Sequence, residues 1–78
     1  MKIKLLYFAQ VSEKLGLSSE EISFDGSNSD ELLNHLNEKY PDLKELKFKI
    51  AVDQTLINTT TELKDGVEVA LLPPFAGG

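Results

Sequence analysis

The strongest fold signal lies in residues 28–41, which read NSDELLNHLNEKYP. Asn28 has the side chain of a helix N-cap, and Glu31 follows at the spacing of a capping box. An apolar stripe at helical spacing consists of Leu32, Leu33 and Leu36. The helix ends before Pro41, because the residue before a proline avoids helical angles. This segment predicts one amphipathic helix that needs an apolar surface to cover.

Strand patterns lie on both sides of this helix. Apolar alternation or short apolar runs mark five strands, at residues 2–8, 20–25, 48–52, around 56–57 and 67–72. A short helix is predicted at 9–15, with Gly16 as its stop. One main helix packed on one face of a mixed sheet is the economical arrangement, so the sequence predicts an α+β domain. The order of the strands does not follow from periodicity.

Composition narrows the function classes. The chain has 78 residues, which is one domain, and it contains no Cys, so disulfides, thiolate metal sites and Cys nucleophiles are excluded. The net charge is −5 and every basic residue is Lys, which argues against nucleic-acid binding. No apolar run is long enough to span a membrane, and the first ten residues lack the order of a signal peptide. We therefore expect a cytoplasmic protein.

Few side chains are candidates for catalysis. His35 is the only His, and a lone His makes no metal site. Glu20 and Glu21 are neighbours on a predicted strand, so they point to opposite faces and form no catalytic pair. A loose basic group is interpreted as solvated surface; it consists of Lys44, Lys47 and Lys49.

The C-terminal tail is the most unusual feature. It reads Pro73-Pro74-Phe75-Ala76-Gly77-Gly78. Two prolines favour a stiff, extended start, and Phe75 is a bulky anchor. After Phe75 no side chain is larger than a methyl group, so the tail suits a narrow channel. A frayed terminus is the alternative.

Four segments carry a resemblance to a known family. They are Phe8-Ala9-Gln10-Val11, Ala51-Val52-Asp53-Gln54, the run DGVEVALLPP at 65–74, and Gly77-Gly78. With this spacing the whole chain resembles the MoaD-type sulfur carriers, the small subunits of molybdopterin synthase. Two departures are mild: Leu71-Leu72 stands where the family often has aromatic residues, and Asp53 where it often has Asn.

The resemblance implies a fold and a role. The fold is the β-grasp of ubiquitin, with residues 1–72 as the domain and 73–78 as an extended carrier tail. An ATP-dependent enzyme adenylates the Gly78 carboxylate, and sulfur then converts it to a thiocarboxylate. The tail, with Gly77, enters the large catalytic subunit, which forms the dithiolene of molybdopterin. The chain itself is expected to bind no cofactor or metal, to catalyse nothing alone, and to work in a hetero-oligomer.

The resemblance also implies where that partner docks. In a β-grasp sheet the first and last strands are parallel neighbours, so their apolar ends lie side by side. The predicted partner interface consists of Leu6, Phe8, Leu56, Ala70, Leu72, Pro73, Pro74 and Phe75. In the alternative, the short helix at 9–15 folds back over this patch.

Three other functions stay open from the sequence. The first is a sulfur carrier for another product such as thiazole, and the second is a protein modifier joined through Gly78 to lysines of target proteins. The third is an unprocessed scaffold domain. The intact mass of the protein from cells and a gel for conjugates separate these alternatives.

Overall fold

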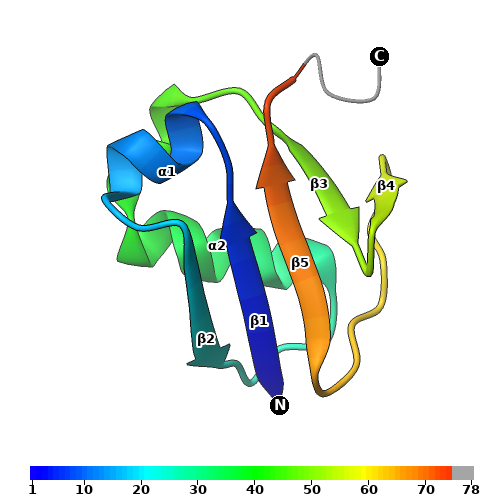
Figure 1. Cartoon of the computed structure of the whole chain (residues 1–78). Coiled ribbons are helices and arrows are strands. Elements are labelled where there is room, and N and C mark those ends of the chain that lie inside the picture. Colours follow the sequence, from blue (N-terminus) through cyan, green and yellow to red (C-terminus); the bar gives the residue numbers. More distant parts are fainter. Residues whose placement is uncertain (75–78) are drawn as a thin grey trace.

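The computed structural model describes residues 1–74. In chain order the elements are β1 (Lys2–Tyr7), α1 (Gln10–Leu15), β2 (Ser19–Ser23), α2 (Ser29–Lys39), the 3₁₀ helix η1 (Pro41–Glu45), β3 (Lys49–Val52), β4 (Thr55–Ile57) and β5 (Val67–Leu72). One main helix, α2, accompanies one five-stranded sheet (Figure 1). The predicted α+β architecture is confirmed.

The sheet has the order β2-β1-β5-β3-β4. The central strands β1 and β5 run parallel, and Leu6 pairs with Ala70 in their register. The other neighbouring strands are antiparallel. This is the mixed sheet of a β-grasp domain, and the parallel pairing of first and last strands is confirmed.

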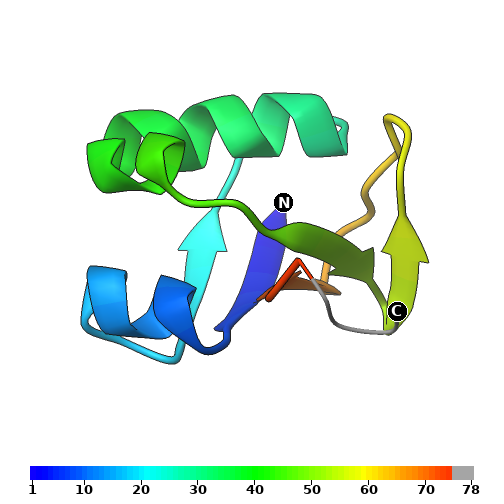
Figure 2. The same ribbon diagram turned by 90° about the horizontal axis from the view of Figure 1, so that it is seen from above.

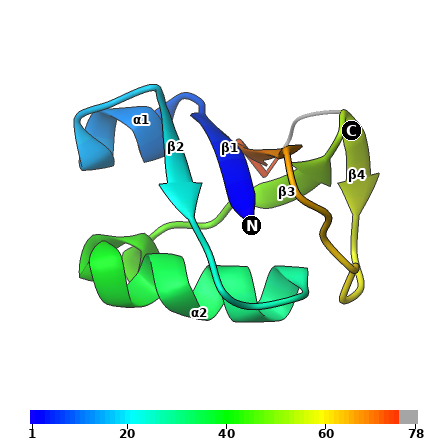
Figure 3. The same cartoon turned by 90° about the horizontal axis from the view of Figure 1, so that it is seen from below.

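The two faces of the sheet differ. The predicted inward positions of β1 and β5 are buried; they are Ile3, Leu5, Tyr7, Val67, Val69 and Leu71. They pack in one cluster with Leu32 and Leu36 of α2. Each such side chain contributes about 1.5–3 kcal/mol through removal of apolar surface from water. Figures 2 and 3 show α2 on one side of the central strands, and Figure 1 views the opposite, open face with α2 behind it.

The start of α2 has a variant of the predicted cap. The Asn28 side-chain oxygen accepts the Glu31 backbone N–H at 2.9 Å, which satisfies one free donor of the first turn. The Glu31 carboxylate reaches back one residue further than in a capping box and accepts the Ser27 N–H at 2.8 Å. The predicted N-terminus of the helix is therefore right, although the reciprocal bond goes to Ser27.

Two segments differ from the predicted elements. Pro41 was interpreted as a stop, but it is also the first residue of η1, which buries Leu43. This follows because proline already has the backbone angle that a first helical turn needs. The second strand is Ser19–Ser23 rather than 20–25. Phe24 lies beyond its end and is buried, with its ring 5.7 Å from that of His35.

None of the helices in residues 1–74 combines the length and hydrophobicity needed to cross a bilayer.

Candidate partner-docking surface

The parallel pairing of β1 and β5 brings two distant parts of the chain together. Both strands end at the same edge of the sheet (Figure 1). Phe8, directly after β1, lines one hollow together with Pro73 and Pro74, which follow β5. The Phe8 backbone N–H donates a hydrogen bond to the Leu71 carbonyl at 3.1 Å. Phe8 is thereby tied directly to the strand that leads into Pro73 and Pro74.

Apolar side chains remain uncovered at this edge of the open face. Phe8 and Leu56 are each 44% exposed, which is unusual for large apolar residues. We define the tail-end surface as Leu6, Phe8, Leu56, Leu72, Pro73 and Pro74. Helix α1 begins at Gln10 and leaves Phe8 exposed, so the alternative in which this helix covers the patch is wrong.

The centre of the tail-end surface is a floor of small residues. Leu6 pairs with Ala70, Ala70 with Ala51, and Ala51 with Leu56, in one row across four strands. Directly paired residues face the same side of a sheet. Ala51 and Ala70 are only 5% and 8% exposed, so Ala70 forms a floor and offers a partner little surface of its own.

The Phe8–Ala9 corner is held in an unusual backbone conformation. Ala9 has φ 52° and ψ −125°, a backbone conformation that residues other than glycine rarely adopt. The Phe8 carbonyl accepts the Val11 N–H at 3.1 Å, so the peptide groups on both sides of the aromatic ring are fixed. A hollow of about 170 Å³ lies next to the corner and is lined by Phe8, Ala9, Gln10, Val11, Lys47, Pro73 and Pro74.

The rest of the predicted site lies outside the described residues. This applies to Phe75, the predicted anchor, and to Gly77 and Gly78, the predicted carrier end. The structure brings together Leu6, Phe8, Leu56, Ala70, Leu72, Pro73 and Pro74, and the role of these residues as an interface stays a prediction.

A polar cluster that the sequence did not predict lies at the same end of the sheet, on the core side. The Glu20 carboxylate accepts hydrogen bonds from the Tyr7 hydroxyl at 2.6 Å and the Tyr40 hydroxyl at 2.7 Å. It also forms an ion pair with the Lys39 ammonium at 3.0 Å. We call these four residues the Glu20 clasp. They join β1, β2 and the end of α2 through contacts between residues far apart in sequence.

The clasp changes the acidity of its members. Burial raises the pKa of Tyr7 well above its usual range, and the hydrogen bond to Glu20 adds to the rise. For Glu20, burial alone would raise the pKa, but hydrogen bonds from Tyr7, Tyr40 and Lys39 outweigh it and lower the pKa. These groups are satisfied by one another, so the clasp is a structural tie rather than a reactive centre.

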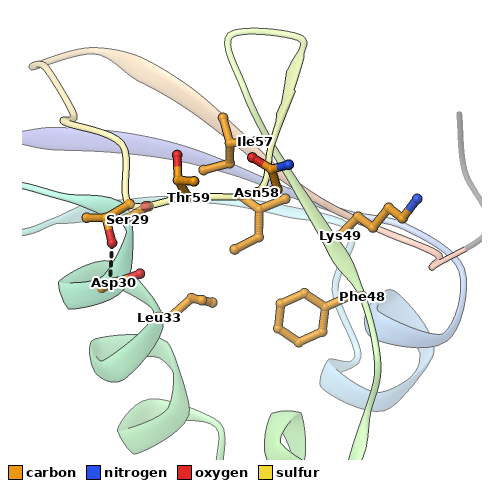
Figure 4. Close-up of a pocket in the computed structure, with 10 residues that line it drawn as sticks. Ser29, Asp30, Leu33, Phe48, Lys49, Ile57, Asn58 and Thr59 are labelled. Carbon is orange, nitrogen blue, oxygen red and sulfur yellow. Dashed lines mark hydrogen bonds between the residues drawn. The ribbon is translucent and has the colours of Figure 1, made fainter.

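Another hollow lies between α2 and the strands β3 and β4 (Figure 4). It has a volume of about 450 Å³ and an apolar floor of Leu33, Phe48, Ile50 and Ile57. At its rim the Asp30 carboxylate accepts a hydrogen bond from the Thr60 hydroxyl. Within residues 1–74, no three His, Cys, Asp or Glu side chains are grouped so as to hold a metal ion. The charged residues that line this hollow are Asp30 and Lys49.

Comparison with known proteins gives matches along nearly the whole chain. Residues 5–78 match the model of the ThiS family. The chain is 38% identical to a molybdopterin synthase sulfur carrier subunit of Escherichia coli, over 97% of this chain and 99% of that protein.

Two solved structures show the same fold. One is the complex of subunits 1 and 2 of the molybdopterin-converting factor of Helicobacter pylori, with a TM-score of 0.73, 31% identity and full coverage of both chains. The other is the small archaeal modifier protein 1 of Methanosarcina acetivorans, with a TM-score of 0.81 and 28% identity, over 99% of this chain and 96% of that one.

Proposed function

This chain belongs to the ThiS family, and we propose that it is the sulfur carrier subunit of a molybdopterin synthase. Its C-terminal Gly78 carboxylate is the working group, and the folded domain presents that group to partner enzymes. The single observation that carries the proposal is the placement of the tail. The last strand delivers Pro73 and Pro74 beside an uncovered apolar surface, on a chain whose family match reaches residue 78.

The chemistry at Gly78 proceeds in two steps. A carboxylate is a poor electrophile, so a carboxylate oxygen first attacks the α-phosphorus of ATP in an activating enzyme, which gives an acyl adenylate and releases pyrophosphate. A sulfur nucleophile then displaces AMP and leaves a thiocarboxylate. Gly78 has no Cβ, so attack at its carbonyl carbon is unhindered. ATP and the catalytic groups belong to the partners.

The thiocarboxylate then serves the large synthase subunit. The tail enters that subunit and transfers its one sulfur to a pterin precursor, and hydrolysis returns Gly78 to a carboxylate. Because a dithiolene contains two sulfur atoms, two such transfers complete it. The relative from Helicobacter pylori was solved as a complex of subunits 1 and 2, which supports a hetero-oligomer of this kind. We place the exchange in the cytoplasm, with which a chain lacking Cys is compatible.

A second candidate function has a specific observation in its favour. The Methanosarcina acetivorans relative is named a small archaeal modifier protein, and it shares this fold at 28% identity. A modifier would form an amide between Gly78 and a lysine of a target protein. Cell extract probed for this chain would then show a ladder of heavier conjugates, whereas a dedicated sulfur carrier gives none.

The proposal is tested by shortening or extending the tail by one residue. We expect the variant that lacks Gly78, and a variant with one residue added after Gly78, to lose sulfur transfer in a reconstituted synthase assay. Both should melt like the wild type, because β5 ends at Leu72 and the core closes before the tail. Full activity of the shortened chain would show that the tail is not the carrier group.

A further inference from the structure

Two lysines lie next to the tail-end surface. Lys49 pairs with Leu72 in the register of β3 and β5, so its side chain projects from the open face. Lys47 lines the hollow beside Phe8, Pro73 and Pro74. The interpretation of the basic group as solvated surface is confirmed, because Lys44, Lys47 and Lys49 are all exposed. Lys47 and Lys49 differ from Lys44, which lies on η1, in that they line hollows next to the tail-end surface.

Among residues 1–74, lysine is the only charged residue type that lines the two hollows at this edge of the open face. A second hollow is lined by Lys49, Leu56, Ile57 and Asn58. Among residues 1–74, no carboxylate lines either hollow, and neither Lys47 nor Lys49 forms an ion pair. Two lysines therefore flank the apolar tail-end surface on a chain of net charge −5.

Carboxylates of the open face gather at its other end. Glu21 and Glu68 are both register partners of Lys4. Asp53 accepts the Glu68 backbone N–H at 3.1 Å. This end of the open face holds three carboxylates, together with Lys2 and Lys4, whereas the hollows at the tail end hold Lys47 and Lys49 and no carboxylate. The open face therefore carries a charge gradient along β1 and β5.

We propose that Lys47 and Lys49 form a basic rim that docks an acidic area of the large synthase subunit, next to the opening that receives the tail. The inference rests on the proposed function and adds the chemistry of the partner surface. An apolar contact alone is non-directional. Charges at a rim accelerate association and fix orientation, and this gradient aligns the tail with the opening. The partner is thus recognised by carboxylates placed around an apolar centre.

The test is a double charge reversal. Binding of the large subunit encoded by the same organism is measured by titration calorimetry for wild type and for Lys47→Glu/Lys49→Glu, at about 50 mM and about 300 mM salt. We expect wild-type binding to weaken as salt rises. At low salt the variant should bind at least ~10-fold more weakly, with its salt dependence reduced or reversed. Both lysines are exposed, so circular dichroism should show an unchanged fold.

The matched control is Lys64→Glu. It makes the same change at an exposed lysine in the turn that precedes β5, at the opposite end of the strand from the tail. Because Lys64 lies far from the tail, the single reversal Lys64→Glu should leave the affinity for the large subunit within ~3-fold of wild type. The basic rim is disproved if the double variant binds like wild type. It is also disproved if Lys64→Glu weakens binding by as much as the double variant does for each lysine reversed. A wild-type chain that fails to bind the large subunit would instead disprove the proposed function.

Discussion

Phe8 is the residue on which the predicted docking surface is centred. Its ring is exposed, yet its backbone is held by Leu71 on one side and Val11 on the other, next to the unusual conformation of Ala9. An aromatic side chain has only two rotatable angles, so on a fixed backbone it loses little freedom on binding, and such residues often carry a large share of interface energy. An exposed ring on a fixed backbone suits Phe8 to this use.

We therefore predict that Phe8→Ala weakens binding to the large subunit at least ~10-fold, which corresponds to about 1.4 kcal/mol. Titration calorimetry measures the affinity, and thermal melting checks the fold. Lys44→Ala is the control, since Lys44 lies on η1 outside both hollows, and it should bind like the wild type. If folded Phe8→Ala binds as tightly as the wild type, the partner docks elsewhere.

At the scale of elements, the Glu20 clasp joins three parts of the fold. It connects β1 through Tyr7, β2 through Glu20 and the end of α2 through Lys39 and Tyr40. The Glu20 side chain is only 16% exposed, so its hydrogen bonds are shielded from competing water. Tyr7 directly precedes Phe8, so the clasp also steadies the strand that presents the aromatic ring.

The lowered pKa of Glu20 predicts how stability depends on pH. Its ordinary value is 4.5 and the folded value is lower, so between the two the unfolded chain binds more protons. The stabilisation is therefore present above pH ~4.5 and is lost as pH falls through the folded pKa. We predict that Glu20→Gln lowers the free energy of unfolding by about 2 kcal/mol near neutral pH and flattens this acid dependence. Urea unfolding at several pH values measures both effects.

Glu21→Gln is the matched control for the clasp. Glu21 is the next residue on the same strand, but its ion pair with Lys2 is exposed at 3.5 Å. Exposed ion pairs contribute little to stability, so Glu21→Gln should change the free energy of unfolding by no more than ~1 kcal/mol. A Glu20→Gln protein that is as stable as the wild type at neutral pH, with the same loss in acid, would contradict the account of the clasp.

The elements also show how far sequence reasoning reaches. Alternation in β1 and β5 correctly predicted that Ile3, Leu5, Val67 and Val69 face the core, because side-chain direction on a strand is a local property. The 3₁₀ helix η1 was missed because its proline was interpreted only as a stop.

Long-range contacts were the part that sequence could not supply. The clasp joins Glu20 to residues 13, 19 and 20 positions away, and no local pattern marks such partners. The position of Lys49 beside Leu72 likewise depends on the pairing of β3 with β5. Strand order came from the family resemblance, and with it the nearness of Phe8 to the tail.

The whole molecule is a thin domain with one helix layer and one sheet layer. A domain of this size buries only about 60–65% of its unfolded surface, which leaves little room for an enclosed active site. The parallel central strands place the exposed aromatic residue and the start of the tail at one edge. This architecture suits a reagent that is carried between enzymes, with catalysis supplied by each partner.

The central claim is that Gly78 carries sulfur, and the intact mass of the protein isolated from growing cells tests it most directly. The account predicts a species heavier by the difference between one sulfur and one oxygen atom. Fragmentation should place the change on Gly78, and the species should disappear from cells that lack the activating enzyme. A chain that always carries a plain carboxylate, even when the large subunit is deleted and the thiocarboxylate should accumulate, would contradict the account.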